Sequence, residues 1–433
     1  MSSTVGDLLR QAESSMLEKR WEDALAALGA AIEADPHPLQ PRFMVAHCLE
    51  EMKETNRAFE VYRSLALHCF KTGYPLQGMV ATKRAMNIQM ADDLLDTMIS
   101  LYSLESDKVD HEEQLLPLQQ PDEGKQAPDP PEATDKLKHR VAQLASSFPR
   151  GTAPSMLPPF PLVSLLSADA AFPIADIIEV RNYKPGDYIV REGEPCTSIY
   201  MLAFGEVEVQ QGSDDDAHTV ALMPTGSIFG EMALISEGPR VASARAIRNS
   251  DVLELSVPDL EEAAGDLDDL TLAIAKFTRQ RFLTNLLVTS PVFTPFPPEQ
   301  RREILDRFTS VGVMTDEVVI KEGQQGPGLY LILGGEVEVT KHEGGSQVHL
   351  ATLKEGSVFG EISLVMDTPA TATVRATRGG EFLFLPREDF QQLVEQQPEV
   401  KEKLTQLSQQ RLEEQRLAIA REQKLSEDGA FIF

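Results

Sequence analysis

One stretch of the chain combines the residue types that a sugar-phosphate site needs. Gly226 and Gly230 precede Glu231, and Arg240 follows. Glycine lets the backbone turn tightly and approach a ligand closely, a carboxylate accepts hydrogen bonds from sugar hydroxyls, and a guanidinium has forked N–H donors that suit phosphate oxygens. Residues 230–234 are expected to begin a short helix, whose free N–H groups favour an anion. We therefore predict a receptor for a ribose phosphate.

The same pattern occurs a second time further along the chain. The tripeptide Phe-Gly-Glu stands at residues 229–231 and again at 359–361, and the residues around it recur at the same offset. Self-similarity at a fixed spacing marks a duplicated structural unit. The two copies differ at the cation, because the first has Arg240 where the second has Ala370.

The second copy is expected to be a degenerate site. Without the cation a bound phosphate loses a charge-assisted hydrogen bond of about 1.5–3 kcal/mol, which predicts binding at least about tenfold weaker. Arg375 matches Arg245 of the first copy, so it is not a replacement. The expected role of this copy is structural, either docking against the first copy or dimerisation. Its degenerate site consists of Gly360, Glu361, Ala370, Thr371 and Thr373.

Both copies predict β structure. Short apolar runs are bounded by glycine and proline, and Glu-Val-Glu-Val at 206–209 and 336–339 alternates with the period of two that a half-buried strand shows. Several short strands at regular spacing predict a small barrel or jelly roll. A helical stretch is expected after each copy, at about residues 258–288 and 387–425.

Residues 1–105 predict helices, because glycine and proline are sparse there and alanine and leucine are common. Similar motifs begin at Ala24 and Ala58, and Pro36 stands at the end of the first. This spacing resembles the period of about 34 residues of a tetratricopeptide array, in which helix pairs stack because one pair cannot bury its apolar face alone. The alternative is a generic helical bundle. The expected repeats are 7–38, 41–72 and a degenerate third at 75–103.

Residues 106–155 change in composition to proline mixed with acidic residues and glutamine. Few apolar residues occur there, so we expect a solvated linker with one short helix from Thr134 to Ser147. The expected domains are helical repeats at 1–105, a proline-rich acidic linker at 106–155, two barrels at 156–288 and 289–397, and a C-terminal helix and tail at 398–433.

Residues 226–243 closely resemble the phosphate-binding cassette of cyclic nucleotide-binding domains, as found in protein kinase A regulatory subunits and the catabolite activator protein. The resemblance covers about residues 156–425. It implies that Glu231 binds the ribose 2′-hydroxyl, that Arg240 pairs with the cyclic phosphate, and that backbone N–H groups line the phosphate. The ligand-binding residues that it implies are Gly230, Glu231, Met232, Ala233, Arg240, Val241 and Ser243.

Two features of the sequence bear on the base of such a ligand. Val241 departs from the family pattern of alanine or threonine, and guanine-preferring members resemble one another in having threonine there. Valine lacks that hydroxyl, so the resemblance favours cyclic AMP over cyclic GMP. Phe277 and Phe282 are candidates to stack on the base, at about 1–3 kcal/mol. The alternative is that both phenylalanines pack against the barrel.

Net charge, cysteine content and the length of apolar runs argue against several other classes of function. A net charge of −28 without a basic patch makes nucleic acid a poor partner. Three widely spaced cysteines form neither a disulfide framework nor a zinc site, and no metal is expected. The N-terminus lacks a signal-peptide pattern, and no apolar run reaches the roughly 20 residues that span a bilayer. We expect a cytoplasmic protein without membrane contact.

No nucleophile elbow, Walker loop or zinc-protease motif occurs, so no catalytic residue, cofactor or enzyme activity is expected. The expected fold is multidomain α+β, an all-α tetratricopeptide-like array followed by two tandem β-roll or jelly-roll cyclic nucleotide-binding domains with flanking helices. We interpret the chain as a non-catalytic cyclic AMP receptor that couples ligand binding in the first barrel to an unidentified protein partner of the array. A homodimer through the last helix and an exposed last helix both stay open. The alternative function is a constitutive scaffold whose barrels bind no nucleotide.

Overall fold

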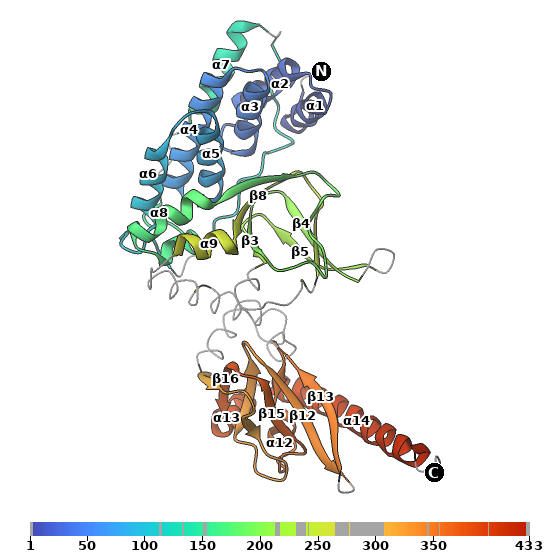
Figure 1. Ribbon diagram of the computed structural model, residues 1–433. Coiled ribbons are helices and arrows are strands. Elements are labelled where there is room, and N and C mark those ends of the chain that lie inside the picture. The colour runs from blue at the N-terminus through green and yellow to red at the C-terminus, as the bar shows by residue number, and fades with distance from the viewer. Residues whose placement is uncertain are drawn as a thin grey trace. The chain divides into compact units, whose positions relative to one another are not determined.

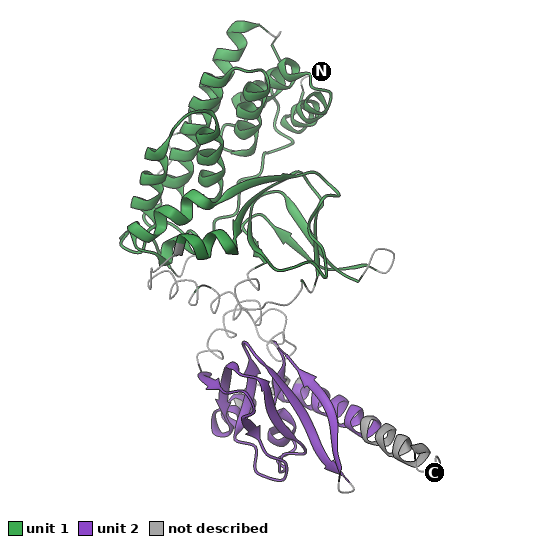
Figure 2. Cartoon of the chain, in the orientation of Figure 1, with its two compact units in different colours: residues 1–277 green, residues 278–433 purple. Residues whose placement is uncertain are grey.

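The computed structural model describes residues 3–111, 115–131, 134–149, 154–212, 217–230, 240, 242–264, 277, 307–343, 346–354, 356–396 and 398–429. The chain forms two compact units, residues 1–277 and 278–433 (Figure 2). The first unit contains a helical array and one barrel, and the second contains the other barrel and the C-terminal helix (Figure 1).

The N-terminal array is helical, as the composition predicts. Its helices are α1 (Val5–Leu17), α2 (Trp21–Ala34), α3 (Gln40–Glu51), α4 (Thr55–Thr72), α5 (Pro75–Ile88) and α6 (Asp92–Tyr102). Their bounds follow the three expected repeats, with α1 packed on α2 and α3 packed on α4. The last pair is less regular, because α6 packs on α4 more than on α5. The tetratricopeptide identity of the array stays a prediction.

Local signals determine where these helices begin and end. Thr4 caps α1, because its hydroxyl accepts from the Asp7 N–H at 3.2 Å while the Asp7 carboxylate accepts from the Thr4 N–H at 3.1 Å. This reciprocal pair satisfies two amides that would otherwise lack partners. Gly73 caps the C-terminal end of α4, with a φ of +86° that glycine adopts without strain. Residues 24–32 of α2, mostly alanine, are all buried, which lets neighbouring helices approach closely.

The segment after the array is anchored to it, whereas a solvated linker was the expectation. The Val5 N–H donates to the carbonyl oxygen of Lys125 at 2.9 Å, and the Ala127 N–H donates to that of Ser3 at 2.9 Å. The chain therefore returns to pair with the start of α1. Hydrogen bonds between backbone groups do not depend on apolar side chains, so the composition of the segment did not predict them.

The helix expected in this segment is α7 (Asp135–Ser146), with the Thr134 hydroxyl accepting from the Leu137 N–H at its first turn. α7 packs on α2, α3 and α4. Leu137 and Val141 are buried in this contact, at 6% and 1% exposed. A few apolar residues spaced four apart are enough to dock one helix face, although the segment as a whole is polar.

The first barrel consists of two four-stranded antiparallel sheets, ordered β1-β8-β3-β6 and β2-β7-β4-β5. Helices η1 and α8 precede these strands and α9 follows them. The bounds are η1 (Val163–Leu165), α8 (Ala168–Ile177), β1 (Glu179–Tyr183), β2 (Tyr188–Val190), β3 (Ser198–Phe204), β4 (Glu206–Gln211), β5 (His218–Pro224), β6 (Ile228–Phe229), β7 (Ser243–Ala246), β8 (Ser250–Ser256) and α9 (Val257–Ala264).

The second barrel repeats this topology strand for strand, with sheets β9-β16-β11-β14 and β10-β15-β12-β13. The predicted duplication is therefore confirmed. The bounds are β9 (Thr309–Val313), β10 (Val318–Ile320), β11 (Gly328–Ile332), β12 (Glu336–Glu343), β13 (Ser346–Leu353), β14 (Val358–Phe359), α12 (Glu361–Val365), β15 (Thr373–Arg378), β16 (Gly380–Pro386), α13 (Arg387–Gln396) and α14 (Pro398–Gly429).

Each barrel closes around side chains from both of its sheets. In the first barrel, Leu202 and Val252 of one sheet share a core with Val207 of the other. Val207 and its counterpart Val337 are fully buried between half-buried glutamates, as the alternation of β4 and β12 predicts. Burial of each such side chain contributes about 1.5–3 kcal/mol. Two stacked sheets with a shared core position Gly230 and Gly360, which directly follow β6 and β14.

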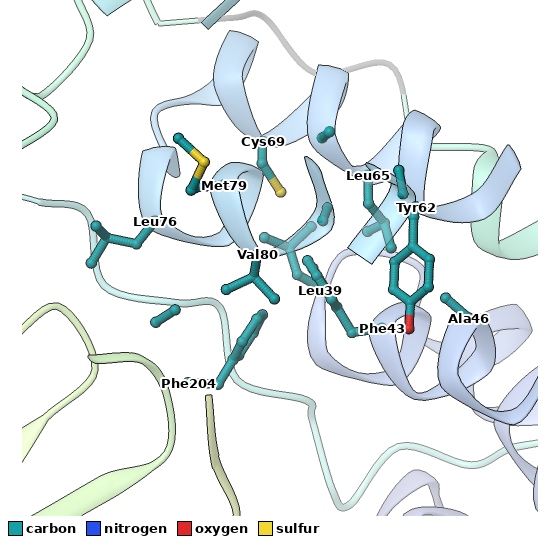
Figure 3. Close-up of a cluster of buried hydrophobic side chains, with 14 of the residues drawn as sticks. Leu39, Phe43, Ala46, Tyr62, Leu65, Cys69, Leu76, Met79, Val80 and Phe204 are labelled. Atoms are coloured by element: carbon teal, nitrogen blue, oxygen red, sulfur yellow. The ribbon is translucent and has the colours of Figure 1, made fainter. Parts of the chain in front are cut away.

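The first barrel packs directly on the helical array (Figure 3). The ring of Phe204 on β3 meets that of Phe43 on α3 edge to face, with centroids 4.8 Å apart. Gln77 of α5, only 4% exposed, donates from Nε2 to the Ala203 carbonyl oxygen at 2.5 Å. This face of α3 and α5 is therefore covered by the barrel.

No helix in the described part of the chain is long and apolar enough to cross a membrane. Within the same residues, histidine, cysteine, aspartate and glutamate side chains do not gather in threes as a metal site requires. The three cysteines are free thiols, with Cys48 and Cys69 buried and Cys196 half-buried.

Candidate functional site

Gly230 follows β6 in a backbone conformation that few other residues adopt. Its φ is +82°, and a Cβ atom there would lie 2.7 Å from the Ser198 carbonyl oxygen. Gly360 takes the same place after β14, with φ of +90° and a Cβ that would lie 2.5 Å from the Gly328 carbonyl oxygen. Both positions need glycine, because a side chain would collide with the neighbouring strand. The tight turn after each strand therefore depends on its glycine.

The backbone of Arg240 is fixed to the loop between β2 and β3. Its N–H donates to the Glu194 carbonyl oxygen at 2.8 Å, and its own carbonyl oxygen accepts from the Gly193 N–H at 2.8 Å. These two bonds hold the Arg240 backbone against Gly193 and Glu194, from where its side chain reaches the Gly230 carbonyl oxygen after β6. The direction of the side chain is therefore set by the barrel frame.

The Arg240 side chain is buried within the first barrel, with 7% of its surface exposed. Nη2 donates to the Ser198 carbonyl oxygen at 2.8 Å, and Nη1 donates to that of Gly230 at 3.3 Å. Its guanidinium carbon lies 5.6 Å from the centre of the Tyr200 ring. Among the described residues no group accepts from Nε. Within the described part of the chain, the hydrogen-bond partners of this cation are therefore neutral, and its Nε donor is unused.

Ser243 lies on β7 with 8% of its surface exposed, and its Oγ accepts from the Glu192 N–H at 2.9 Å. The Ser243 hydroxyl oxygen therefore joins β7 to Glu192, which precedes the two residues that bond the Arg240 backbone. Phe277 is 5% exposed and belongs to the main hydrophobic core of the first unit. This burial agrees with the alternative in which Phe277 packs against the protein and does not stack on a base. The predicted residues that lie outside the described part of the chain are Glu231, Met232, Ala233, Val241 and Phe282.

Ala370 occupies in the second barrel the position that Arg240 has in the first. Its N–H donates to the Gln324 carbonyl oxygen at 2.8 Å, and its carbonyl oxygen accepts from the Gly323 N–H at 2.9 Å, the same pair of bonds. Thr373 likewise replaces Ser243, with its Oγ1 accepting a backbone N–H at 3.1 Å. The backbone around Ala370 is therefore equivalent to that around Arg240. The second barrel lacks the cation only because the side chain at this position is alanine.

Glu361 begins α12 and is almost completely buried, with 2% of its surface exposed. Its Oε1 accepts from Nη1 of Arg411 at 2.7 Å, and the same nitrogen donates to the Val358 carbonyl oxygen at 2.6 Å. Arg411 belongs to α14, which packs on α12 and β13. The carboxylate that the resemblance assigns to a sugar is therefore paired with a cation of this chain.

The role of Arg411 was not predicted from the sequence. A signal was present, because Gln410-Arg411 repeats Gln280-Arg281 at the same offset as the two cassettes. The apolar stripe of α14 is weak, so its periodicity did not indicate which face meets the barrel. The structure shows that one face of α14 covers the loop after β14.

Residues 180–265 and 311–397 match the family model described as the cyclic nucleotide-binding domain. These two segments are the two barrels. Both barrels are cyclic nucleotide-binding domains. Because the family model covers these segments alone, the helical array lies outside the cyclic nucleotide-binding domains.

Similar domains occur in kinases and kinase regulatory subunits. The cGMP-dependent protein kinase 2 of Rattus norvegicus is 31% identical over 227 residues, or 51% of this chain and 28% of that protein. The cAMP-dependent protein kinase regulatory subunit of Yarrowia lipolytica is 29% identical over 229 residues, or 53% of this chain and 57% of that protein. The chain thus spans less than two thirds of the length of either relative.

Among solved structures, the regulatory domain of Toxoplasma gondii PKA with cAMP is 20% identical, with a TM-score of 0.28 and coverage of 57% of this chain and 92% of that chain. The catabolite activator protein of Thermus thermophilus is 24% identical, with a TM-score of 0.25 and coverage of 31% of this chain and 70% of that chain.

Proposed function

We propose that the first cyclic nucleotide-binding domain is a receptor for cyclic AMP and that binding there regulates a protein partner. The observation that carries the proposal is the buried guanidinium of Arg240. Removing a cation from water costs several kcal/mol, and among the described residues this one receives only neutral partners. A cyclic phosphate would supply the negative charge and accept from the spare donor.

The position of this cation also suits the ligand. Arg240 reaches the carbonyl oxygen of Gly230, the residue that precedes Glu231 in the sequence. The phosphate group and the sugar hydroxyls of a nucleotide are separated by one ribose ring, so their protein partners have to be close together. The contact of Arg240 with Gly230, whose neighbour in the sequence is the carboxylate residue, is in keeping with this requirement.

The second cyclic nucleotide-binding domain is not part of the proposed receptor. Ala370 supplies no cation, and Glu361 is paired with Arg411. A cyclic phosphate in that domain would lose its charge partner, and a ribose would have to share the carboxylate with Arg411. Both effects weaken binding of a cyclic nucleotide there.

The proposed regulation passes through the contact between the first barrel and the array. Phe204 and Ala203 of β3 contact α3 and α5 directly, so a shift of this sheet would move the helices. The relatives are named as protein kinases and kinase regulatory subunits. We therefore propose a protein kinase catalytic chain as the partner, bound on a helical surface that the barrel leaves uncovered, with no catalysis by this chain.

Calorimetric titration of the full chain with cyclic AMP tests the receptor. Wild type is expected to bind one equivalent, and Arg240→Ala is expected to weaken binding at least about tenfold. The matched control is Arg248→Ala, because this side chain is 76% exposed and pairs with Glu206 at the barrel surface. It should leave the affinity unchanged.

Three outcomes would overturn parts of this assignment. Equal affinity for cyclic AMP in Arg240→Ala and wild type would show that Arg240 does not bind the ligand. Absence of heat in wild type, with cyclic AMP and with cyclic GMP, would favour the constitutive scaffold. Tighter binding of cyclic GMP than cyclic AMP would reverse the proposed base preference.

A further inference from the structure

The second cyclic nucleotide-binding domain contains a cavity of about 120 Å³ that is open to solvent on one side. Its walls come from β10, β12, β13 and β15 and from the turn after β14, and α14 covers it. Most of the lining is apolar, and includes Ile320, Val339, Leu350, Ala351, Phe359 and Ala372. The cavity lies where the first domain carries the buried guanidinium.

The cation in the polar part of this lining, Arg411, is already bonded to protein groups and is not free to pair with an anion. Arg411 is bonded to Glu361 at 2.7 Å and to the Val358 carbonyl oxygen at 2.6 Å. Glu414 adds a second carboxylate to the lining, and Ala370 stands at the cation position. An anion entering the cavity would lose hydration and find Glu361 and Glu414 there, while the one cation of the lining is already paired, which disfavours it relative to a neutral molecule. The electrostatics therefore select an uncharged molecule.

The size of the cavity limits the ligand further. An apolar cavity of about 150 Å³ stays dry and binds benzene, whereas sites for drug-sized ligands measure about 300–1,000 Å³. At about 120 Å³ this cavity suits a single ring. A base, sugar and phosphate together would extend out of its open side.

We propose that this cavity binds a small uncharged molecule with one aromatic ring and one hydroxyl group. The ring lies among the apolar side chains of the barrel. The hydroxyl donates to the Glu361 carboxylate, which has more acceptor capacity than its bond from Arg411 uses. This site goes beyond the proposed cyclic AMP receptor and does not depend on it, because it lies in the other domain.

A pair of matched substitutions tests the location. Ala351 on β13 lines the cavity and is half-buried, so Ala351→Leu would fill it. Ala221 on β5 is its counterpart in the first domain and is exposed, so Ala221→Leu is the control. Both changes add the same side chain to the same strand of equivalent barrels.

The probe is phenol, titrated into the full chain with cyclic AMP present and followed by saturation-transfer NMR. Wild type and Ala221→Leu are expected to bind phenol with equal affinity, and Ala351→Leu about tenfold or more weakly. Phenyl phosphate has the same ring with a negative charge and is expected not to bind at this site. Circular dichroism and thermal unfolding establish that each variant is folded.

Three results would overturn the proposal. They are no phenol binding by wild type, equal binding by a folded Ala351→Leu variant, and binding of phenyl phosphate as tight as that of phenol. The comparison of phenol with phenyl phosphate uses wild type alone. It therefore tests the preference for an uncharged ligand even if Ala351→Leu fails to fold. Failure of cyclic AMP to bind would leave the matched variants as a valid test, because they distinguish the two domains.

Discussion

The guanidinium of Arg42 donates a hydrogen bond of 2.9 Å to the carbonyl oxygen of Ala145, at the C-terminal end of α7. The same nitrogen donates to the carbonyl oxygens of Leu144 and Ser147, and Nη2 donates to that of Pro36. Burial lowers the pKa of Arg42 to about 10, so it stays charged at neutral pH. The last carbonyls of a helix carry partial negative charge, so this cation stabilises the end of α7 and fastens it to the array.

Arg42→Met is therefore expected to destabilise the first unit. The methionine fills much of the same volume but leaves buried carbonyl oxygens without donors, which costs about 2–4 kcal/mol. Urea unfolding measures this change. The control is Arg140→Met, whose exposed pair with Glu33 should be worth less than about 1 kcal/mol. A loss in Arg42→Met no larger than in the control would contradict the role of the buried cation.

His68 is expected to make stability depend on pH. Its ring stacks on Phe148 with centroids 3.7 Å apart. Burial, assisted by the charge of Arg42, lowers the pKa of His68 from 6.5 to about 4. The unfolded chain thus binds the proton near pH 6.5 and the folded chain only near pH 4, so the unfolded state holds more protons in this window. Stability should fall as the pH is lowered from about 6.5 to about 4.

Urea midpoints measured across this pH range test the role of His68. His68→Phe keeps a ring against Phe148 and removes the titrating group, so the dependence on pH should become shallower. His139→Phe on the exposed face of α7 is the control and should preserve the wild-type slope. An unchanged slope in His68→Phe would assign the pH dependence to other groups.

Phe204→Ala is expected to separate the first barrel from the helical array. Phe204 is 7% exposed, and removing a buried phenyl ring costs about 3–5 kcal/mol. The lost contact lies between two parts of the first unit, so the calorimetric transition of that unit should split from one into two. Phe172→Ala removes a ring that is 37% exposed and should keep a single transition. One cooperative transition in Phe204→Ala would show that other contacts couple the parts.

Ala370→Arg is expected to create a second cyclic AMP site. Ala370 makes the same two backbone hydrogen bonds as Arg240, so a guanidinium there would be directed into the equivalent place. Calorimetry should show a second equivalent, weaker than the first because Glu361 is paired with Arg411. Ala370→Leu adds bulk without charge and should bind one equivalent. A second equivalent in Ala370→Leu, or in wild type, would show that the cation is not decisive.

Several features of this protein follow from local sequence alone. The constant offset between the two copies predicts two equal barrels, the alternation around Val207 and Val337 predicts which strand faces point inward, and the cassette glycines predict the turns after β6 and β14. Each of these depends on residues close together in the chain, whose side-chain period and backbone freedom determine the local structure. The difference between Arg240 and Ala370 is also visible without a fold.

Other features were decided by the tertiary structure. The docking of Phe204 on Phe43, the capping of α7 by Arg42 and the pairing of Arg411 with Glu361 join segments that are distant in the sequence. Periodicity shows that a helix has an apolar face, but it does not show which surface will cover that face. The cavity in the second domain exists for the same reason, because its volume depends on how strands and α14 meet around side chains that no local pattern relates to one another.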